Sequence, residues 1–89
     1  MTEITTGIAV TVRFFAAARD AAGADTRMLT LPAGATVTDA ISELCGLSGE
    51  MALLLQKCSY LCDGVAVRER SGVLRTGQTL DVLPPFAGG

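Results

Sequence analysis

The sequence predicts an α+β fold in which a mixed sheet packs on one main helix. Three observations lead to this prediction: alternating apolar residues near both ends of the chain, one apolar helical stripe between them, and a tight-turn dipeptide ahead of the last strand. The 89 residues are enough for one domain with a modest core. We expect residues 1–7 to be disordered, residues 8–83 to form the domain and residues 84–89 to form a flexible tail.

Residues 8–15 are expected to form the first strand, because alternate positions are apolar. The face expected to lie on the core carries Ile8, Val10, Val12 and Phe14. Phe15 falls on the opposite face, which we expect to be at least partly exposed. The alanine-rich residues 16–22 predict a short helix or a loop that ends at Gly23, and a second strand follows over residues 26–31.

The main helix is predicted to start at Thr36, which forms a capping box with Asp39. Apolar residues then recur at the spacing of one helical face, and Gly46 is a suitable terminator. The residues of this stripe are Val37, Ala40, Ile41, Leu44 and Cys45. A second, short helix is expected over residues 49–56, where an apolar stripe is also present.

Residues 59–68 predict a hairpin, since Asp63-Gly64 suits the left-handed conformations of a tight turn. The last strand is expected over residues 79–83, with Leu80 and Val82 on the core face and Leu83 on the other. Two prolines then end it, because proline offers no ladder donor. A β-grasp fold satisfies this order of elements, whereas a ferredoxin-like fold needs a second long helix.

The composition argues against several classes of function. Seven Lys and Arg against nine Asp and Glu give a net charge of −2, which offers no electrostatic footprint for nucleic acid or an anionic membrane. No apolar run reaches the roughly 18 residues of a membrane helix, so we expect a cytoplasmic protein. Histidine is absent, which removes the commonest general base and metal ligand and argues against an enzyme that acts alone.

The cysteines are expected to be free structural thiols. Cys58 and Cys62 are separated by three residues instead of the two that are typical of redox and zinc motifs, and Cys45 lies on the predicted core face of the helix. The glycines match neither a dinucleotide fingerprint nor a phosphate loop. We therefore expect this chain to bind no cofactor and no metal.

The C-terminal segment is the strongest candidate for chemistry. From Pro84 to Gly89 it can extend roughly 19 Å at about 3.1 Å per residue, which suits insertion into a partner's active site. Gly88 and Gly89 have no Cβ, so a terminal carboxylate there can pass through a narrow channel. A partner must first activate it, for example as a mixed anhydride with AMP, before a sulfur nucleophile can form a thiocarboxylate. A frayed glycine-rich end remains the simpler interpretation of the dipeptide alone.

Two segments, residues 12–19 (VRFFAAAR) and residues 83–89 (LPPFAGG), together resemble the molybdopterin synthase small subunit family of ubiquitin-like, MoaD-like sulfur carriers. The resemblance implies a β-grasp fold and activation of the terminal glycine by an E1-like adenylating enzyme that uses ATP. It also implies that a sulfurtransferase supplies sulfur, and that the thiocarboxylate donates it to a pterin precursor on the synthase's large, catalytic subunit.

By this resemblance Gly89 carries the adenylate and then the thiocarboxylate. Gly88, Ala87 and Phe86 would thread into the large subunit's active site. Phe86 departs from the family pattern, where a smaller apolar residue is expected, and the family offers no role for the three cysteines.

The resemblance also implies an interface with the partner through Phe15, Leu83 and Val65. The strand phases agree for Phe15 and Leu83, which both fall opposite the core face. Two alternatives stay open: a carrier for thiazole or cysteine synthesis, and a ubiquitin-like modifier that Gly89 joins to a lysine by an isopeptide bond.

Overall fold

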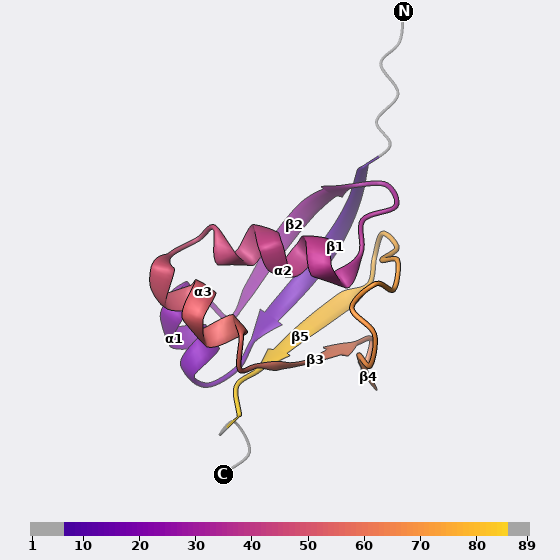
Figure 1. Cartoon of the computed structure of the whole chain (residues 1–89). Coiled ribbons are helices and arrows are strands. Elements are labelled where there is room, and N and C mark those ends of the chain that lie inside the picture. Colours follow the sequence, from indigo (N-terminus) through magenta and orange to yellow (C-terminus); the bar gives the residue numbers. More distant parts are fainter. Residues whose placement is uncertain (1–6, 86–89) are drawn as a thin grey trace, which may run out of the picture.

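The sheet is built around two parallel strands that are far apart in the sequence. The structure is a computed structural model that describes residues 7–85. Its five strands have the order β2-β1-β5-β3-β4 across the sheet. Their bounds are Gly7–Phe14 for β1, Thr26–Pro32 for β2, Ser59–Cys62 for β3, Val65–Ala66 for β4 and Thr79–Leu83 for β5. β1 pairs in parallel with β5 and antiparallel with β2, while β5 pairs antiparallel with β3 (Figure 1).

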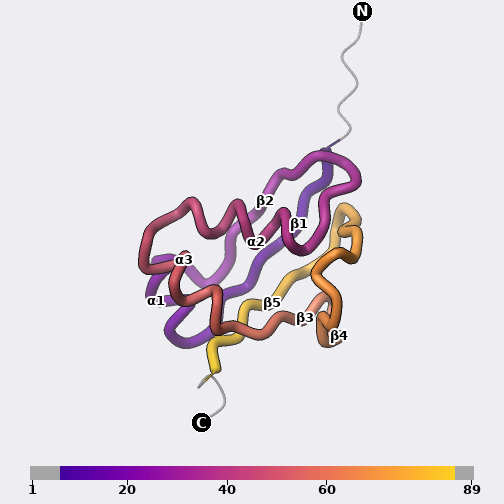
Figure 2. Tube along the Cα trace, in the orientation of Figure 1, coloured from indigo at the N-terminus to yellow at the C-terminus, as the bar shows by residue number. Residues whose placement is uncertain are grey.

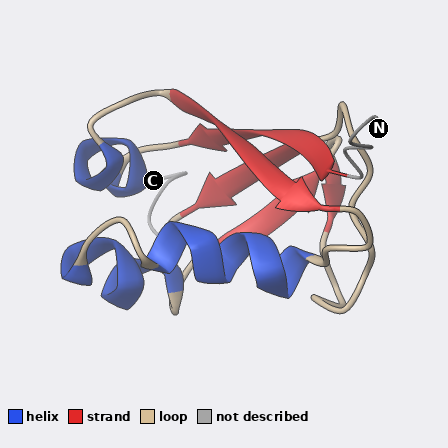
Figure 3. Ribbon diagram, turned by 90° about the horizontal axis from the view of Figure 1, so that it is seen from above, coloured by secondary structure: helices blue, strands red, loops and turns tan. Residues whose placement is uncertain are grey.

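Three helices complete the described part of the chain: α1 (Ala17–Ala22), α2 (Val37–Cys45) and α3 (Gly49–Leu55). Seen from above, α2 and α3 lie along one face of the sheet, and α1 lies near one end of it (Figure 3). The trace in Figure 2 shows how β5 brings the end of the chain back between β1 and β3. No helix within residues 7–85 has the length and apolar character of a membrane span.

The core lies between the helices and the sheet, as the periodicity predicts. Val10, Val12 and Phe14 of β1 are buried, whereas Thr11 and Arg13 between them are not. The other elements contribute the same kind of buried apolar face. Among the side chains that are completely buried, the largest are Leu44 of α2, Met51 and Leu55 of α3, and Leu80 and Val82 of β5.

Helix α2 begins where the capping box predicts. The Asp39 backbone N–H donates to Thr36 Oγ1 (3.2 Å), and the Thr36 N–H donates to the Asp39 carboxylate (2.9 Å). The first two amides of α2 donate to the carbonyls of Gly72 (3.1 Å) and Arg70 (2.9 Å). These bonds satisfy the helix N-terminus and hold the long segment between β4 and β5 against it.

The predicted hairpin is confirmed, with a shorter second strand. Asp63 (φ 50°) and Gly64 (φ 83°) both adopt left-handed conformations, and Cys62 pairs with Val65 across the turn. The second strand is only Val65–Ala66, although the Val67 N–H still donates to the Tyr60 carbonyl at 2.9 Å; by Arg70 the backbone has reached the start of α2.

At the N-terminus, β1 begins at Gly7, a residue that we expected to be disordered, and it ends at Phe14 instead of Phe15. The alanine-rich segment after it is the helix α1.

Candidate functional site

The free face of the sheet, opposite α2 and α3, carries the candidate interface. β1 and β5 run parallel with Phe14 beside Val82, and the Phe15 N–H donates to the Val82 carbonyl at 3.3 Å. Phe15 and Leu83, which follow Phe14 and Val82 in the sequence, therefore lie side by side. They lie on the face of the sheet opposite the buried side chains of Phe14 and Val82. Both side chains are partly exposed. The structure thus brings together two of the three predicted interface residues.

A sharp turn follows Phe15 and fixes where the first strand ends. Ala16 has φ 52° and ψ −126°, a combination that glycine adopts far more readily than alanine. The Ala18 N–H closes this turn on the Phe15 carbonyl at 3.0 Å. Phe15 is therefore held at the C-terminal end of β1, an interior strand, by a backbone conformation that costs energy.

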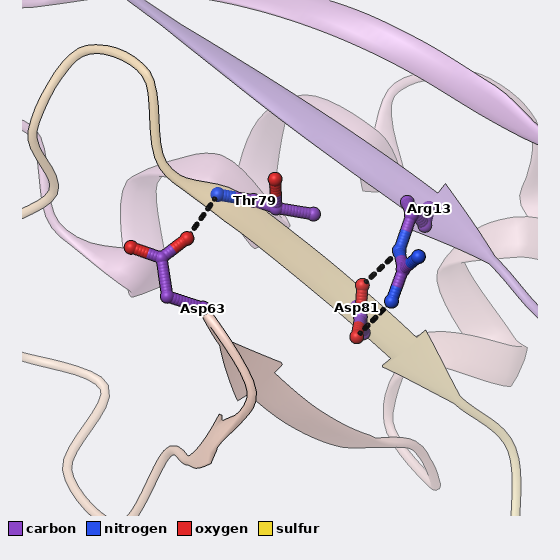
Figure 4. Close-up of polar contacts among 4 residues, drawn as sticks. All are labelled: Arg13, Asp63, Thr79 and Asp81. Atoms are coloured by element: carbon purple, nitrogen blue, oxygen red, sulfur yellow. Dashed lines mark hydrogen bonds and ion pairs between the residues drawn. The ribbon is translucent and has the colours of Figure 1, made fainter.

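An ion pair lies next to these apolar side chains. Arg13 and Asp81 are register partners on β1 and β5. Arg13 Nε donates to Asp81 Oδ1 at 2.7 Å, and Arg13 Nη2 donates to Oδ2 at 2.9 Å (Figure 4). The Arg13 guanidinium also stacks 5.4 Å from the centre of the Phe15 ring. This bidentate pair allows a carboxylate that is only 4% exposed to remain in the sheet.

This ion pair is not predicted by the sequence pattern. Arg13 and Asp81 each fall on the outer face of a predicted strand, but 68 positions separate them in the chain. Only the parallel pairing of β1 with β5 makes them neighbours. An acidic residue at the centre of an otherwise apolar last strand was the available signal.

Val65 lies apart from Phe15 and Leu83. It pairs with Cys62, which in turn pairs with Leu80 of the core face. Val65 therefore lies on the helix side of the sheet at its β4 edge, where it is 67% exposed. Together with Val37 and Val73 it lines a shallow groove of about 300 Å³. Val65 and the Phe15–Leu83 pair therefore form two separate surfaces.

The segment that would carry the chemistry continues directly from β5. Pro84 is buried and Pro85 is exposed. The predicted carrier and threading residues Phe86, Ala87, Gly88 and Gly89 lie outside the described residues. The structure describes only the first two residues of this segment, Pro84 and Pro85, which directly follow Leu83.

The cysteines are free within the described residues, as expected. Cys58 is buried and its Sγ donates to the Leu54 carbonyl at 3.3 Å, while Cys62 is half-buried on β3. Burial raises the pKa of both thiols above that of an ordinary cysteine. Cys58, Tyr60 and Cys62 occupy alternate positions on the core side of one extended segment, which explains the spacing that excluded a redox motif. Within residues 7–85 no cluster of potential metal ligands is present.

Comparison with known proteins places this fold in a family. The sequence model of the ThiS family matches residues 12–89. No curated protein sequence matches the chain. Among solved structures, a Pyrococcus furiosus protein assigned as molybdopterin converting factor subunit 1 is 27% identical, with a TM-score of 0.81, over 88% of this chain and 98% of its own.

Two further structures share the fold at lower identity. SAMP1 from Haloferax volcanii has a TM-score of 0.78 at 24% identity, over 91% of this chain and 99% of its own. In a complex of subunits 1 and 2 of the molybdopterin-converting factor from Helicobacter pylori, the matching chain has a TM-score of 0.70 at 21% identity, over 92% of this chain and 100% of its own. The predicted β-grasp fold is thereby confirmed, and the chain belongs to the ThiS family of sulfur carriers with a ubiquitin-like fold.

Proposed function

We propose that this chain is the sulfur-carrier subunit of a molybdopterin synthase and that Gly89 is its carrier residue. The proposal is carried by one juxtaposition: the apolar pair Phe15 and Leu83 lies where β5 passes into the segment that ends at Gly89. A partner that docks on this pair receives the following residues 84–89 in its own active site, within a reach of roughly 19 Å at about 3.1 Å per residue.

The chemistry follows from the poor reactivity of a carboxylate. An E1-like enzyme would transfer AMP from ATP to the Gly89 carboxylate, which creates a mixed anhydride with a good leaving group. A persulfide on a sulfurtransferase would then displace AMP to form an acyl disulfide, and a thiol reductant would cleave its S–S bond and leave Gly89 as a thiocarboxylate. In the large subunit the thiocarboxylate sulfur would bond to a carbon of the pterin precursor and displace an oxygen substituent from it. Water would then cleave the resulting thioester, which leaves a thiol on the pterin and returns Gly89 to a carboxylate for another cycle.

The domain supplies binding and presentation in this scheme. Its described residues hold no histidine and no metal-ligand cluster, and its thiols are buried or half-buried with raised pKa values. These features suit a substrate-like subunit whose reactions take place in the active sites of its partners. The Helicobacter pylori relative, which was solved together with a second subunit, supports such an arrangement by analogy of fold.

The test is complementation in the organism of origin after its own copy of the gene has been deleted. The wild-type chain should restore molybdenum-cofactor-dependent enzyme activity, and the chain without Gly89 should not. Gly49→Ala is the matched glycine control, because an added Cβ there meets nothing within 4 Å and the backbone has an ordinary φ.

Full activity without Gly89 would refute the carrier role. A requirement for thiazole or cysteine in the deletion strain, with the molybdenum enzymes unaffected, would instead favour the related carriers. Branched peptides that end in Gly88-Gly89 on lysines of other proteins would favour a modifier, a role suggested by the likeness of fold to SAMP1.

A further inference from the structure

The guanidinium of Arg13 has donors that Asp81 does not use. Asp81 accepts from Nε and Nη2, and among residues 7–85 Nη1 has no hydrogen-bond partner. Figure 4 shows the third guanidinium nitrogen turned away from the carboxylate. The Arg13 side chain is 51% exposed, whereas that of Asp81 is 6% exposed. The pair therefore presents a fixed cationic edge to solvent and keeps its anionic half covered.

This edge belongs to the surface that the partner would cover. The guanidinium stacks on Phe15, which is the neighbour of Leu83. A protein that buries these two apolar side chains must also remove the outer N–H groups of Arg13 from water. Buried N–H donors without an acceptor weaken binding, so an entirely apolar partner surface is excluded.

A hollow beside the guanidinium indicates which acceptor fits. It has a volume of about 220 Å³, and its lining includes Arg13, Phe15, Arg19, Asp25 and Thr26. Arg19 and Asp25 are both well exposed, and their closest charged atoms are 3.7 Å apart. Arg13 and Arg19 are matched by Asp81 and Asp25, so the charges around the hollow balance, but Asp81 leaves the outer N–H donors of Arg13 unused. A carboxylate from a partner would accept from these donors in charge-assisted hydrogen bonds, which are stronger than those to a neutral acceptor.

We propose that Arg13 determines the partner specificity of this face and that its outer edge binds a carboxylate side chain of the large subunit. Asp81 acts as a positioning residue, because it fixes the plane of the guanidinium before the partner arrives. The partner that fits is apolar opposite Phe15 and Leu83 and carries one acidic side chain opposite the hollow. This inference rests on the proposed function for the identity of the partner.

The experiment measures binding of the full chain to the large subunit from the same organism by isothermal titration calorimetry. The double variant R13M/D81L replaces the ion pair by apolar side chains, a change that commonly leaves folding intact or improves it. We expect an unchanged or higher melting temperature and a roughly tenfold to hundredfold loss of affinity, as for a lost charge-assisted hydrogen bond. Leu53→Asp, at an exposed position of α3 on the helix side of the sheet, should bind like the wild type, and Leu83→Asp should bind far more weakly.

A second variant keeps the test valid if the double variant does not fold. Arg13→Lys keeps the charge opposite Asp81 but removes the outer donors of the fork, and it should also weaken binding. The wild-type affinity should fall as salt rises, and this dependence should shrink in R13M/D81L, which offers no charge to a carboxylate of the partner.

Wild-type affinity in a folded R13M/D81L variant would overturn the inference and leave the proposed function standing. Binding that is lost on substitution but does not depend on salt would overturn the carboxylate as the acceptor. If the wild-type chain binds no large subunit at all, the proposed function itself fails, a result distinct from both.

Discussion

At the scale of single residues, Tyr60 of β3 contacts both α3 and the segment between β4 and β5. Its ring is buried below the guanidinium of Arg70, 5.0 Å from Cζ, and its hydroxyl donates to the Leu55 carbonyl at 2.8 Å. Burial, with a smaller contribution from the nearby Cys58 thiol, raises the pKa of Tyr60 to about 12. The folded state therefore holds this proton more tightly than the unfolded state does.

This shift predicts a loss of stability at high pH. The contribution of Tyr60 is fully present below its unfolded pKa of 10.0, and it is lost as the pH rises toward about 12. Tyr60 is the only tyrosine and the chain has no tryptophan, so tyrosinate absorbance reports on it directly. We expect a titration midpoint well above that of free tyrosine in the native protein and an ordinary one in urea. The same midpoint in both states would contradict the burial of the Tyr60 hydroxyl.

The ion pair between Arg13 and Asp81 could not be predicted from the sequence of either strand alone. Alternation correctly placed both side chains on the outer face of their strands, and it placed Phe15 and Leu83 there as well. Alternation cannot say which strands pair or in what register. Alternation also could not predict that Val65 lies apart from Phe15 and Leu83. Its position on the groove side follows from its pairing with Cys62.

At the scale of elements, the sequence was enough to predict features that depend on residues close together in the chain. The box at Thr36 and Asp39 marks the start of α2, and the turn at Asp63 and Gly64 marks the hairpin. The segment between β4 and β5 gave no such signal. Its backbone is held by hydrogen bonds to the start of α2, for example from the Leu74 N–H to the Ala35 carbonyl at 2.8 Å. Such contacts connect distant parts of the chain and leave no local pattern.

The capping box should have a measurable effect on stability. Thr36→Ala removes the side-chain acceptor of the Asp39 N–H, and we expect a loss of about 1 kcal/mol in the free energy of unfolding. Urea denaturation followed by circular dichroism measures this loss. Ser42→Ala is the control: the residue is exposed in the middle of α2 and makes no cap, so its substitution should be neutral or slightly stabilising. Equal effects of the two substitutions would show that the cap contributes nothing.

At the scale of the whole molecule, the fold places one exposed surface next to the start of the C-terminal segment. The parallel pairing of β1 with β5 places Phe15, Arg13 and Leu83 on one face, and Leu83 is the residue from which the C-terminal segment departs. The order of elements was enough to predict a β-grasp fold from the sequence. The composition of the proposed docking face was only half predictable, because it depends on pairing between the first and last strands.

The carrier role that we propose for Gly89 is tested most directly by the intact mass of the chain isolated from its own cells. We expect a fraction heavier by the difference between one sulfur and one oxygen atom, and fragmentation should place that difference at Gly89. Alkylation with a thiol reagent should trap it in addition to the three cysteines. A chain found only with its carboxylate mass, even after incubation with ATP, the adenylating enzyme and a sulfur donor, would contradict the account.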